Sequence, residues 1–184
     1  MSKKKLALVF ILMLLGVGGV FLWQKNQKEV AELNKGLPEG MRVVKNLQGE
    51  YWVVNKLDGY EFRAPETWSG IRSINYFRDF PIQNTTGFIL ESPYGDLIRL
   101  VQYGLGESNF EIEDWVKELN DKFEGIYQKY GKEHLQGYEV IKAEEEEFGI
   151  AISYFFREKS NIYEIKAFRI YEDWIQEIIS SGKW

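Results

Sequence analysis

The sequence has 184 residues, of which 45% are hydrophobic and 16% aromatic, with a formal net charge of −5 and no cysteine. The absence of cysteine excludes disulfide bonds, thiolate metal sites and lipid attachment through a cysteine side chain. Beyond the three N-terminal lysines, 20 basic residues stand against 28 acidic ones, and this acidity argues against a phosphate-binding surface for nucleic acid.

The first 23 residues predict a transmembrane signal anchor. Lys3, Lys4 and Lys5 precede an uncharged run of 18 residues from Leu6 to Trp23. As a helix this run would be about 27 Å long, close to the hydrocarbon core of about 30 Å. Gly16-Val17-Gly18 is a poor cleavage site, so we expect the segment to be retained, with a cleaved secretory signal as the alternative. Under the positive-inside rule the N-terminus is cytoplasmic, and the rest of the chain is expected to be extracytoplasmic in the cell membrane.

Residues 24–40 follow as a charged linker, which Pro38 and Gly40 end, and a single folded domain is expected over residues 41–184. Alternation of period two predicts strands in the first part of this domain, over residues 41–45, 51–55, 60–64, 71–78, 87–91 and 96–103. Asp58-Gly59 predicts a tight hairpin turn between the second and third of them.

The clearest predicted element is a long amphipathic helix in the middle of the chain. Its apolar stripe consists of Ile112, Trp115, Val116, Leu119 and Phe123. The stripe is expected to continue through Tyr127 and Tyr130 to Gly131, and Ser108 or Asn109 is expected to cap the start.

Three more strands, over residues 138–143, 149–157 and 162–169, and a short helix over residues 172–180 complete the predicted elements. Gly182 suits the C-terminal cap of that helix and would let Trp184 fold back beside it. The order of elements lacks the strand–helix alternation of a parallel sheet. The predicted class is therefore α+β, with an antiparallel sheet of about six to eight strands flanked by helices and preceded by one transmembrane helix.

Three segments of the chain resemble the PsbP-like superfamily, whose namesake is an extrinsic subunit of the photosynthetic oxygen-evolving complex. They are Tyr60-Glu-Phe-Arg-Ala-Pro-Glu-Thr-Trp68, Glu113-Asp-Trp115 and Ile162-Tyr-Glu-Ile165. The resemblance covers about residues 41–184 and implies an α/β/α sandwich around an antiparallel sheet. Because members of this superfamily are mostly non-enzymatic, it also implies a binding or assembly role.

Candidate groups for catalysis or metal binding have ordinary explanations. His134, the only histidine, is expected in a polar loop after the long helix, where it would be solvated. The acidic run Glu144–Glu147 could attract a divalent cation, but consecutive carboxylates on an extended chain point to opposite faces. The long helix carries a further acidic set, which the helix dipole favours without any chemistry: Glu111, Glu113, Asp114 and Glu118. No residue is assigned to catalysis, to a metal or to a cofactor.

Aromatic residues in the first strands are the candidate interaction surface, namely Tyr51, Trp52, Tyr60, Phe62 and Trp68. Tyr51 and Trp52 are adjacent and must point to opposite faces, so some of these rings are expected to be exposed or to line a groove. The alternative is that they pack under the helices. Asn84-Thr85-Thr86 is a formal N-glycosylation triplet in an external loop.

The leading hypothesis is a membrane-anchored extracytoplasmic domain that binds a protein or a small ligand without catalysis. The alternatives are a carboxylate-dependent envelope hydrolase and a purely structural envelope component. A pocket lined by two or more desolvated carboxylates would favour the hydrolase, whereas a groove or a patch of exposed aromatic residues would favour the binding module.

Overall fold

The computed structural model describes residues 24–79, 82–104, 111–145 and 150–184. The predicted signal anchor, residues 1–23, lies outside these ranges. Within them, no helix combines the length and the apolar character needed to cross a membrane.

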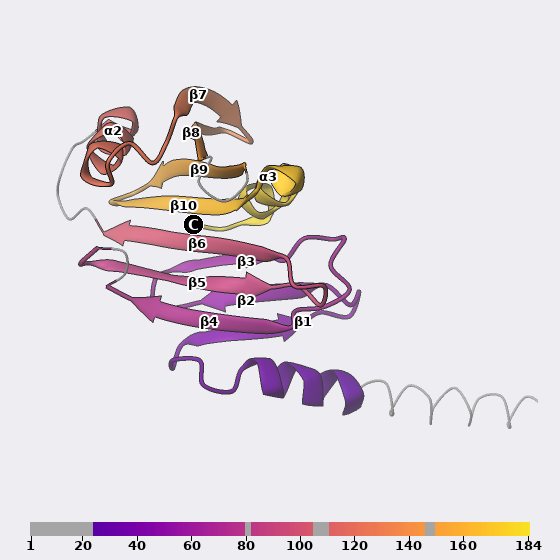
Figure 1. The fold of residues 1–184 in the computed structure, drawn as a ribbon. Helices are drawn as coiled ribbons and strands as arrows, with labels where there is room; N and C mark the ends of the chain where they lie inside the picture. The colour runs from indigo at the N-terminus through magenta and orange to yellow at the C-terminus, as the bar shows by residue number, and fades with distance from the viewer. Residues whose placement is uncertain (1–23, 80–81, 105–110, 146–149) are drawn as a thin grey trace, which may run out of the picture.

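The described ranges contain ten strands in two antiparallel sheets (Figure 1). The larger sheet has seven strands in the order β4-β5-β6-β10-β9-β8-β7, and the smaller has the order β1-β2-β3. The strands are β1 (Met41–Lys45), β2 (Tyr51–Asn55), β3 (Tyr60–Arg63), β4 (Ser73–Arg78), β5 (Thr85–Glu91), β6 (Leu97–Gly104), β7 (Lys129–Leu135), β8 (Tyr138–Glu145), β9 (Ala151–Glu158) and β10 (Asn161–Phe168). The helices are α2 (Ile112–Lys122) and α3 (Glu172–Ser181), with a 3₁₀ turn η1 (Arg169–Tyr171) before α3 and a further helix over residues 24–33.

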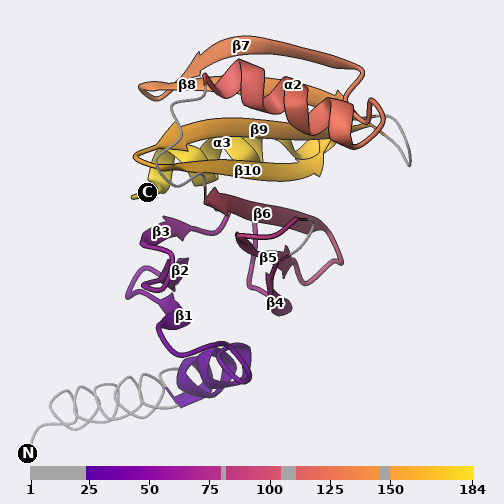
Figure 2. The same cartoon turned by 90° about the vertical axis from the view of Figure 1, so that its left-hand side faces the viewer.

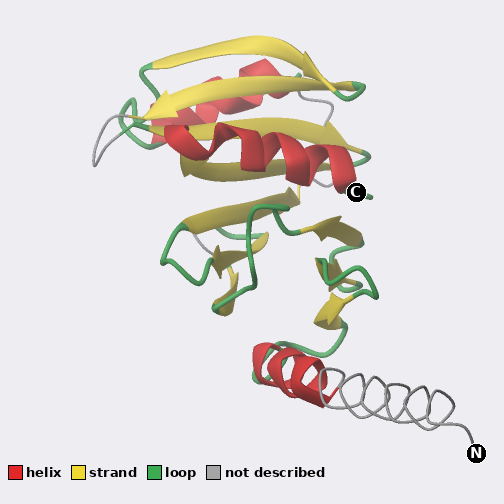
Figure 3. Cartoon of the chain, turned by 90° about the vertical axis from the view of Figure 1, so that its right-hand side faces the viewer, coloured by secondary structure: helices red, strands yellow, loops and turns green. Residues whose placement is uncertain are grey.

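The two faces of the large sheet are covered by different elements (Figures 2 and 3). Helix α2 packs on one face, where it buries Trp115 and Leu119 against β6, β8, β9 and β10. On the other face, α3 and the small sheet enclose the larger hydrophobic cluster. Successive strand residues alternate between these faces, so Val101 packs with α2 while Leu100 packs in the larger cluster.

The predicted α+β class with antiparallel strands is confirmed, and the seven strands of the large sheet lie within the predicted six to eight, but the second sheet was not predicted. The first three strands form their own sheet, because β3 pairs with β2 and not with β4. Strand β7 was not predicted. It is the exposed edge of the large sheet, and six of its seven residues are solvent-exposed, so it lacks the apolar alternation that signals a strand.

The long helix is shorter than its stripe predicted, because α2 ends at Lys122 and Tyr130 lies in β7. Glu124 and Gly125 both adopt positive φ and reverse the chain. The Asn120 side chain then accepts a hydrogen bond from the Tyr127 backbone N–H at 2.7 Å. Glu111 is the N-cap residue and makes no side-chain capping bond within the described part of the chain, and the expected caps, Ser108 and Asn109, lie outside the described residues.

The helix over residues 24–33 and the turn after it make several contacts with the small sheet. Leu33 is buried with the larger cluster. The Asn34 amide pairs with the backbone of Val43, donating through Nδ2 at 2.9 Å and accepting through Oδ1 at 2.6 Å. Tyr51 donates a hydrogen bond to Glu29. These contacts attach part of the expected linker to β1 and β2.

The predicted return of Trp184 to the core is confirmed. Trp184 is 6% exposed and stacks on Phe62 with ring centroids 5.8 Å apart. Gly182 is the C-cap residue of α3, as expected, and its φ of −75° is not left-handed. It is needed for close approach instead, because a Cβ at this position would lie 2.3 Å from the Trp184 ring.

Candidate functional site

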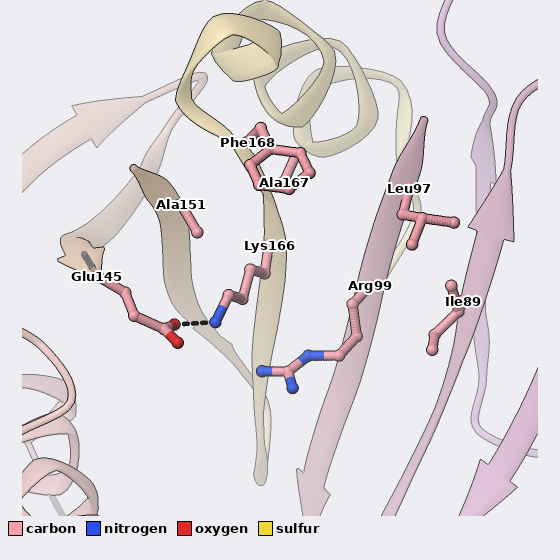
Figure 4. Close-up of a pocket in the computed structure, with 8 residues that line it drawn as sticks. All are labelled: Ile89, Leu97, Arg99, Glu145, Ala151, Lys166, Ala167 and Phe168. Carbon is pink, nitrogen blue, oxygen red and sulfur yellow. Dashed lines mark hydrogen bonds and ion pairs between the residues drawn. The ribbon is translucent and has the colours of Figure 1, made fainter. Parts of the chain in front are cut away.

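A hollow of about 280 Å³ opens on the part of the α2 face that α2 does not cover. Its lining comes from β5, β6, β8, β9 and β10 and consists of Ile89, Leu97, Arg99, Glu145, Ala151, Lys166, Ala167 and Phe168 (Figure 4). Arg99 belongs to the same alternating row of β6 as Val101 and Tyr103, which pack with α2. The hollow is therefore the open continuation of the surface that α2 buries.

Strand register brings the lining residues together. Lys166 on β10 pairs with Arg99 on β6, and Phe168 on β10 pairs with Ala151 on β9. The apolar side chains at the rim remain partly in solvent, since Leu97 and Phe168 are each 45% exposed. Such exposure on a concave surface is typical of a binding site.

The polar side chains of the hollow gather at one end, where Lys166 forms an ion pair with Glu145 (Figure 4). Burial, together with the nearby Arg99 guanidinium, lowers the pKa of Lys166 to about 8. The Glu145 carboxylate acts in the opposite direction, because it stabilises the ammonium form. Arg99 uses Nη2 to bind Glu164 at 3.0 Å, while its Nε is buried without a hydrogen-bond acceptor.

Glu164 lies beside the hollow, on the same face of the large sheet, with none of its surface exposed. Its Oε1 accepts hydrogen bonds from Arg99 at 3.0 Å, Ser153 at 2.9 Å and Tyr127 at 3.3 Å, and its Oε2 accepts one from Tyr103 at 2.7 Å. Because this carboxylate is fully buried and does not line the hollow, it orients Arg99 and is not itself open to a ligand.

Electrostatics around Glu164 agree with this arrangement. The charge of Glu164 raises the pKa of Arg99 above its usual value. Burial, and then the Glu164 carboxylate, raise the pKa of Tyr103 and of Tyr127. Both tyrosines thus remain neutral donors in the folded state up to strongly alkaline pH.

The sequence analysis did not bring these residues together as a site: Tyr127 was expected only in the apolar stripe of the long helix, and Glu145 only in the acidic run. Glu164 lies within the segment Ile162–Ile165 that suggested the family resemblance, and a glutamate between apolar residues of a predicted central strand is an available signal. The partners come from β6, β9 and the chain before β7, however, and only the strand register brings them within hydrogen-bond distance.

The aromatic residues predicted as an interaction surface are mostly in the core, as the packing alternative expected. Tyr51, Tyr60, Phe62 and Trp68 are each at most 7% exposed, and Trp52 is half-buried. They do not form an exposed surface, because β2 and β3 turn one face toward the large sheet. Tyr51 and Trp68 do line a second hollow of about 160 Å³ beside Arg63.

The acidic side chains that were considered as candidate sites do not come together in the fold. On α2, Glu111, Glu113, Asp114 and Glu118 are all exposed. Of the run Glu144–Glu147, Glu144 and Glu145 are bound to basic side chains, and Glu146 and Glu147 lie outside the described residues.

His134 is exposed, as expected, although it lies in β7 and not in a loop. Asn84 is also exposed, in a turn with φ 60°. Among the described residues, no three His, Cys, Asp or Glu side chains are arranged to hold a metal ion.

Comparison with known proteins gives a similarity of structure but none of sequence. No family model matches the chain, and no curated protein matches it. The solution structure of cyanobacterial PsbP (CyanoP) from Synechocystis sp. PCC 6803 is similar, with a TM-score of 0.43, 9% identity, and coverage of 81% of this chain and 95% of that chain.

Proposed function

We propose that this chain is a membrane-anchored, extracytoplasmic, non-catalytic binding domain whose ligand site is the hollow beside α2. The observation that supports this is the combination of a concave surface of about 280 Å³ with apolar side chains held open to water. Burial of apolar surface stabilises by roughly 25 cal/mol per Å², so a ligand that covers these side chains would gain this free energy on binding.

The same hollow gives little support to the hydrolase alternative. Its lining includes one carboxylate, Glu145, and Lys166 holds that carboxylate in an ion pair. The second nearby carboxylate, Glu164, is fully buried, accepts hydrogen bonds from four side chains and does not line the hollow. General acid–base catalysis needs two groups that reach the substrate, and the residues that line the hollow do not provide such a pair.

The experiment measures binding of small amphiphiles to the full chain in lipid nanodiscs, by isothermal titration with empty nanodiscs subtracted. The probes are 1-heptanol, heptanoate and heptylamine. Ala151→Phe fills the hollow, and Phe168→Ser removes an apolar wall at a partly exposed position. Ala31→Phe, on the exposed side of the helix over residues 24–33, is the matched control.

We expect at least one probe to bind the wild type and the control, and to bind both hollow variants at least about tenfold more weakly, a difference of about 1.4 kcal/mol. Circular dichroism establishes that each variant is folded. If no probe binds the wild type, or if both folded hollow variants bind as the wild type does, the hollow is not the ligand site.

A further inference from the structure

Resting on the proposed function, we infer that the ligand is an organic monocarboxylate with an apolar tail. Its carboxylate binds at the Lys166 and Arg99 end of the hollow, and its tail lies along Leu97 and Phe168. Three features of the hollow support this ligand: its size, the distribution of polar groups in it, and the balance of hydrogen-bond donors and acceptors.

Size limits the occupant to a small molecule or to the end of a longer one. A hollow of about 280 Å³ is close to the lower end of ligand pockets, which are roughly 300–1,000 Å³. Heptanoate, a small molecule with a seven-carbon chain, is a probe of suitable size. The hollow is too small to enclose a folded peptide segment.

The polar and apolar groups lie at opposite ends. Figure 4 shows the Lys166 ammonium and the Arg99 guanidinium converging beside Glu145, while Phe168, Leu97 and Ile89 lie away from them. Exposed apolar side chains continue beyond the rim, with Ile150 at 44% and Ile170 at 82% exposure. A ligand that matches this surface is polar at one end and apolar along the rest.

The polar end has more hydrogen-bond donors than acceptors. Lys166 and Arg99 together carry eight N–H donors, as an ammonium and a guanidinium do. Two of those donors are used by Glu145 and Glu164, and the buried Arg99 Nε has no acceptor among the described residues. Glu164 is fully buried outside the lining, so the lining itself has two cations and one carboxylate, Glu145. An anionic, acceptor-only group complements this end better than an alcohol or an amine.

Glu145 competes with such a ligand, because it already occupies Lys166. Glu145 is the last residue of β8, whereas Lys166 lies within β10 in the middle of the sheet. A ligand carboxylate that takes the Lys166 ammonium must therefore displace the Glu145 carboxylate or share the ammonium with it. This competition makes the effect of removing Glu145 opposite to the effect of removing Lys166.

The test compares the three seven-carbon probes on the full chain in nanodiscs. We expect heptanoate to bind the wild type about tenfold more tightly than 1-heptanol, because a hydrogen bond between charged groups is stronger than one to a neutral hydroxyl. Lys166→Met should abolish this preference, and Glu145→Gln should strengthen it without changing the affinity for 1-heptanol. Lys56→Met, at an exposed lysine in the small sheet's hairpin turn, is the matched control.

A double variant, Glu145→Gln with Lys166→Met, leaves no unpaired ion in the hollow and guards against misfolding of the single variants. It should also lack the preference. Equal affinity for heptanoate and 1-heptanol, tighter binding of heptylamine, or a preference that survives in the folded double variant would overturn the inference. If 1-heptanol alone binds and Ala151→Phe blocks it, the proposed function stands and only the inference fails. If no probe binds, both fail.

The same carboxylate chemistry is found in short soluble acids and in fatty acids released from lipids. A series from pentanoate to hexadecanoate distinguishes the two. Affinity that stops rising near seven carbons indicates a soluble acid, and affinity that continues to rise indicates a fatty acid whose tail extends past Ile150 and Ile170.

Discussion

Replacing Trp184 with alanine should destabilise the whole domain, although the residue lies beyond the last helix. Its ring packs on Phe62, Phe156 and Tyr163, with centroids 5.8, 5.0 and 5.1 Å away. These residues come from β3, β9 and β10, so Trp184 joins the small sheet to the large one. Reciprocal backbone hydrogen bonds between Lys183 and Glu61, at 2.7 and 2.8 Å, hold the chain end in place.

The magnitude follows from burial. Trp184 is 6% exposed, and replacing a buried tryptophan with alanine costs about 3–5 kcal/mol. For a protein of 150–250 residues each kcal/mol lowers the melting temperature by about 2–4 °C, so the expected decrease is about 6–20 °C. Gly182→Ala should act in the same direction, because the added Cβ would displace the Trp184 ring.

Thermal and urea unfolding of the full chain, followed by far-UV circular dichroism, measure this effect. Tyr94→Ala is the control, because Tyr94 is an aromatic residue that is 81% exposed. It should change the stability by less than about 0.5 kcal/mol. A melting temperature for Trp184→Ala within the error of the wild type would show that the chain end is not part of the core, and the packing described for β3 would then be wrong.

Four further results are expected. Leu119→Ala should lower the free energy of unfolding by about 2–5 kcal/mol, measured with urea, because Leu119 is on the face of α2 that is buried against the sheet. An unchanged unfolding midpoint would contradict this packing. Because burial raises the pKa of Tyr103 and Tyr127, the stability associated with their neutral forms should be present below about pH 10 and lost as the pH rises above it. Urea midpoints on both sides of pH 10 test this, and Tyr103→Phe should reduce the loss. Glu164→Gln should cost about 3–5 kcal/mol, because it leaves the partly buried Arg99 without its counter-charge. Adding Arg99→Leu to this variant removes the unpaired cation and keeps the amide oxygen as an acceptor for the neighbouring hydroxyls, so it should restore part of that stability in the same assay. The N-terminal segment is expected to be retained as a membrane anchor, so the mature protein should sediment with membranes and begin at Met1. A soluble form that begins near Gly19 would refute the retention of the anchor.

The sequence was sufficient where a periodic pattern coincided with burial on one side. Strands β1, β2 and β3, the hairpin at Asp58-Gly59 and the start of α2 all have such patterns, and they lie where they were predicted. The pattern misled at the end of α2. Tyr127 continues the apolar stripe in sequence, yet it reaches the same hydrophobic cluster by a turn and not by a further turn of helix.

The candidate site was not predictable in the same way. Its residues come from five strands that span more than 70 positions, and each looks ordinary in its own strand. Lys166 and Arg99 meet because β10 pairs with β6, a pairing that no local pattern specifies. The aromatic residues gave the opposite error, because a ring in an alternating strand signals burial as readily as exposure.

The charges beside the hollow support a functional role for this face. Burying Glu164, with Arg99 partly buried next to it, costs desolvation free energy, and apolar residues of similar volume are often at least as stable. The three hydroxyl donors around Glu164 compensate that cost and fix the carboxylate, which in turn fixes the guanidinium. A domain that needed only a packed core would gain nothing from this arrangement, since α2 and its apolar partners already cover the adjoining surface. The arrangement suits the proposed ligand site, because it holds a cation at a fixed position in the hollow. The double variant Glu164→Gln with Arg99→Leu separates the two properties, because it should recover part of the stability and lose the preference for heptanoate over 1-heptanol.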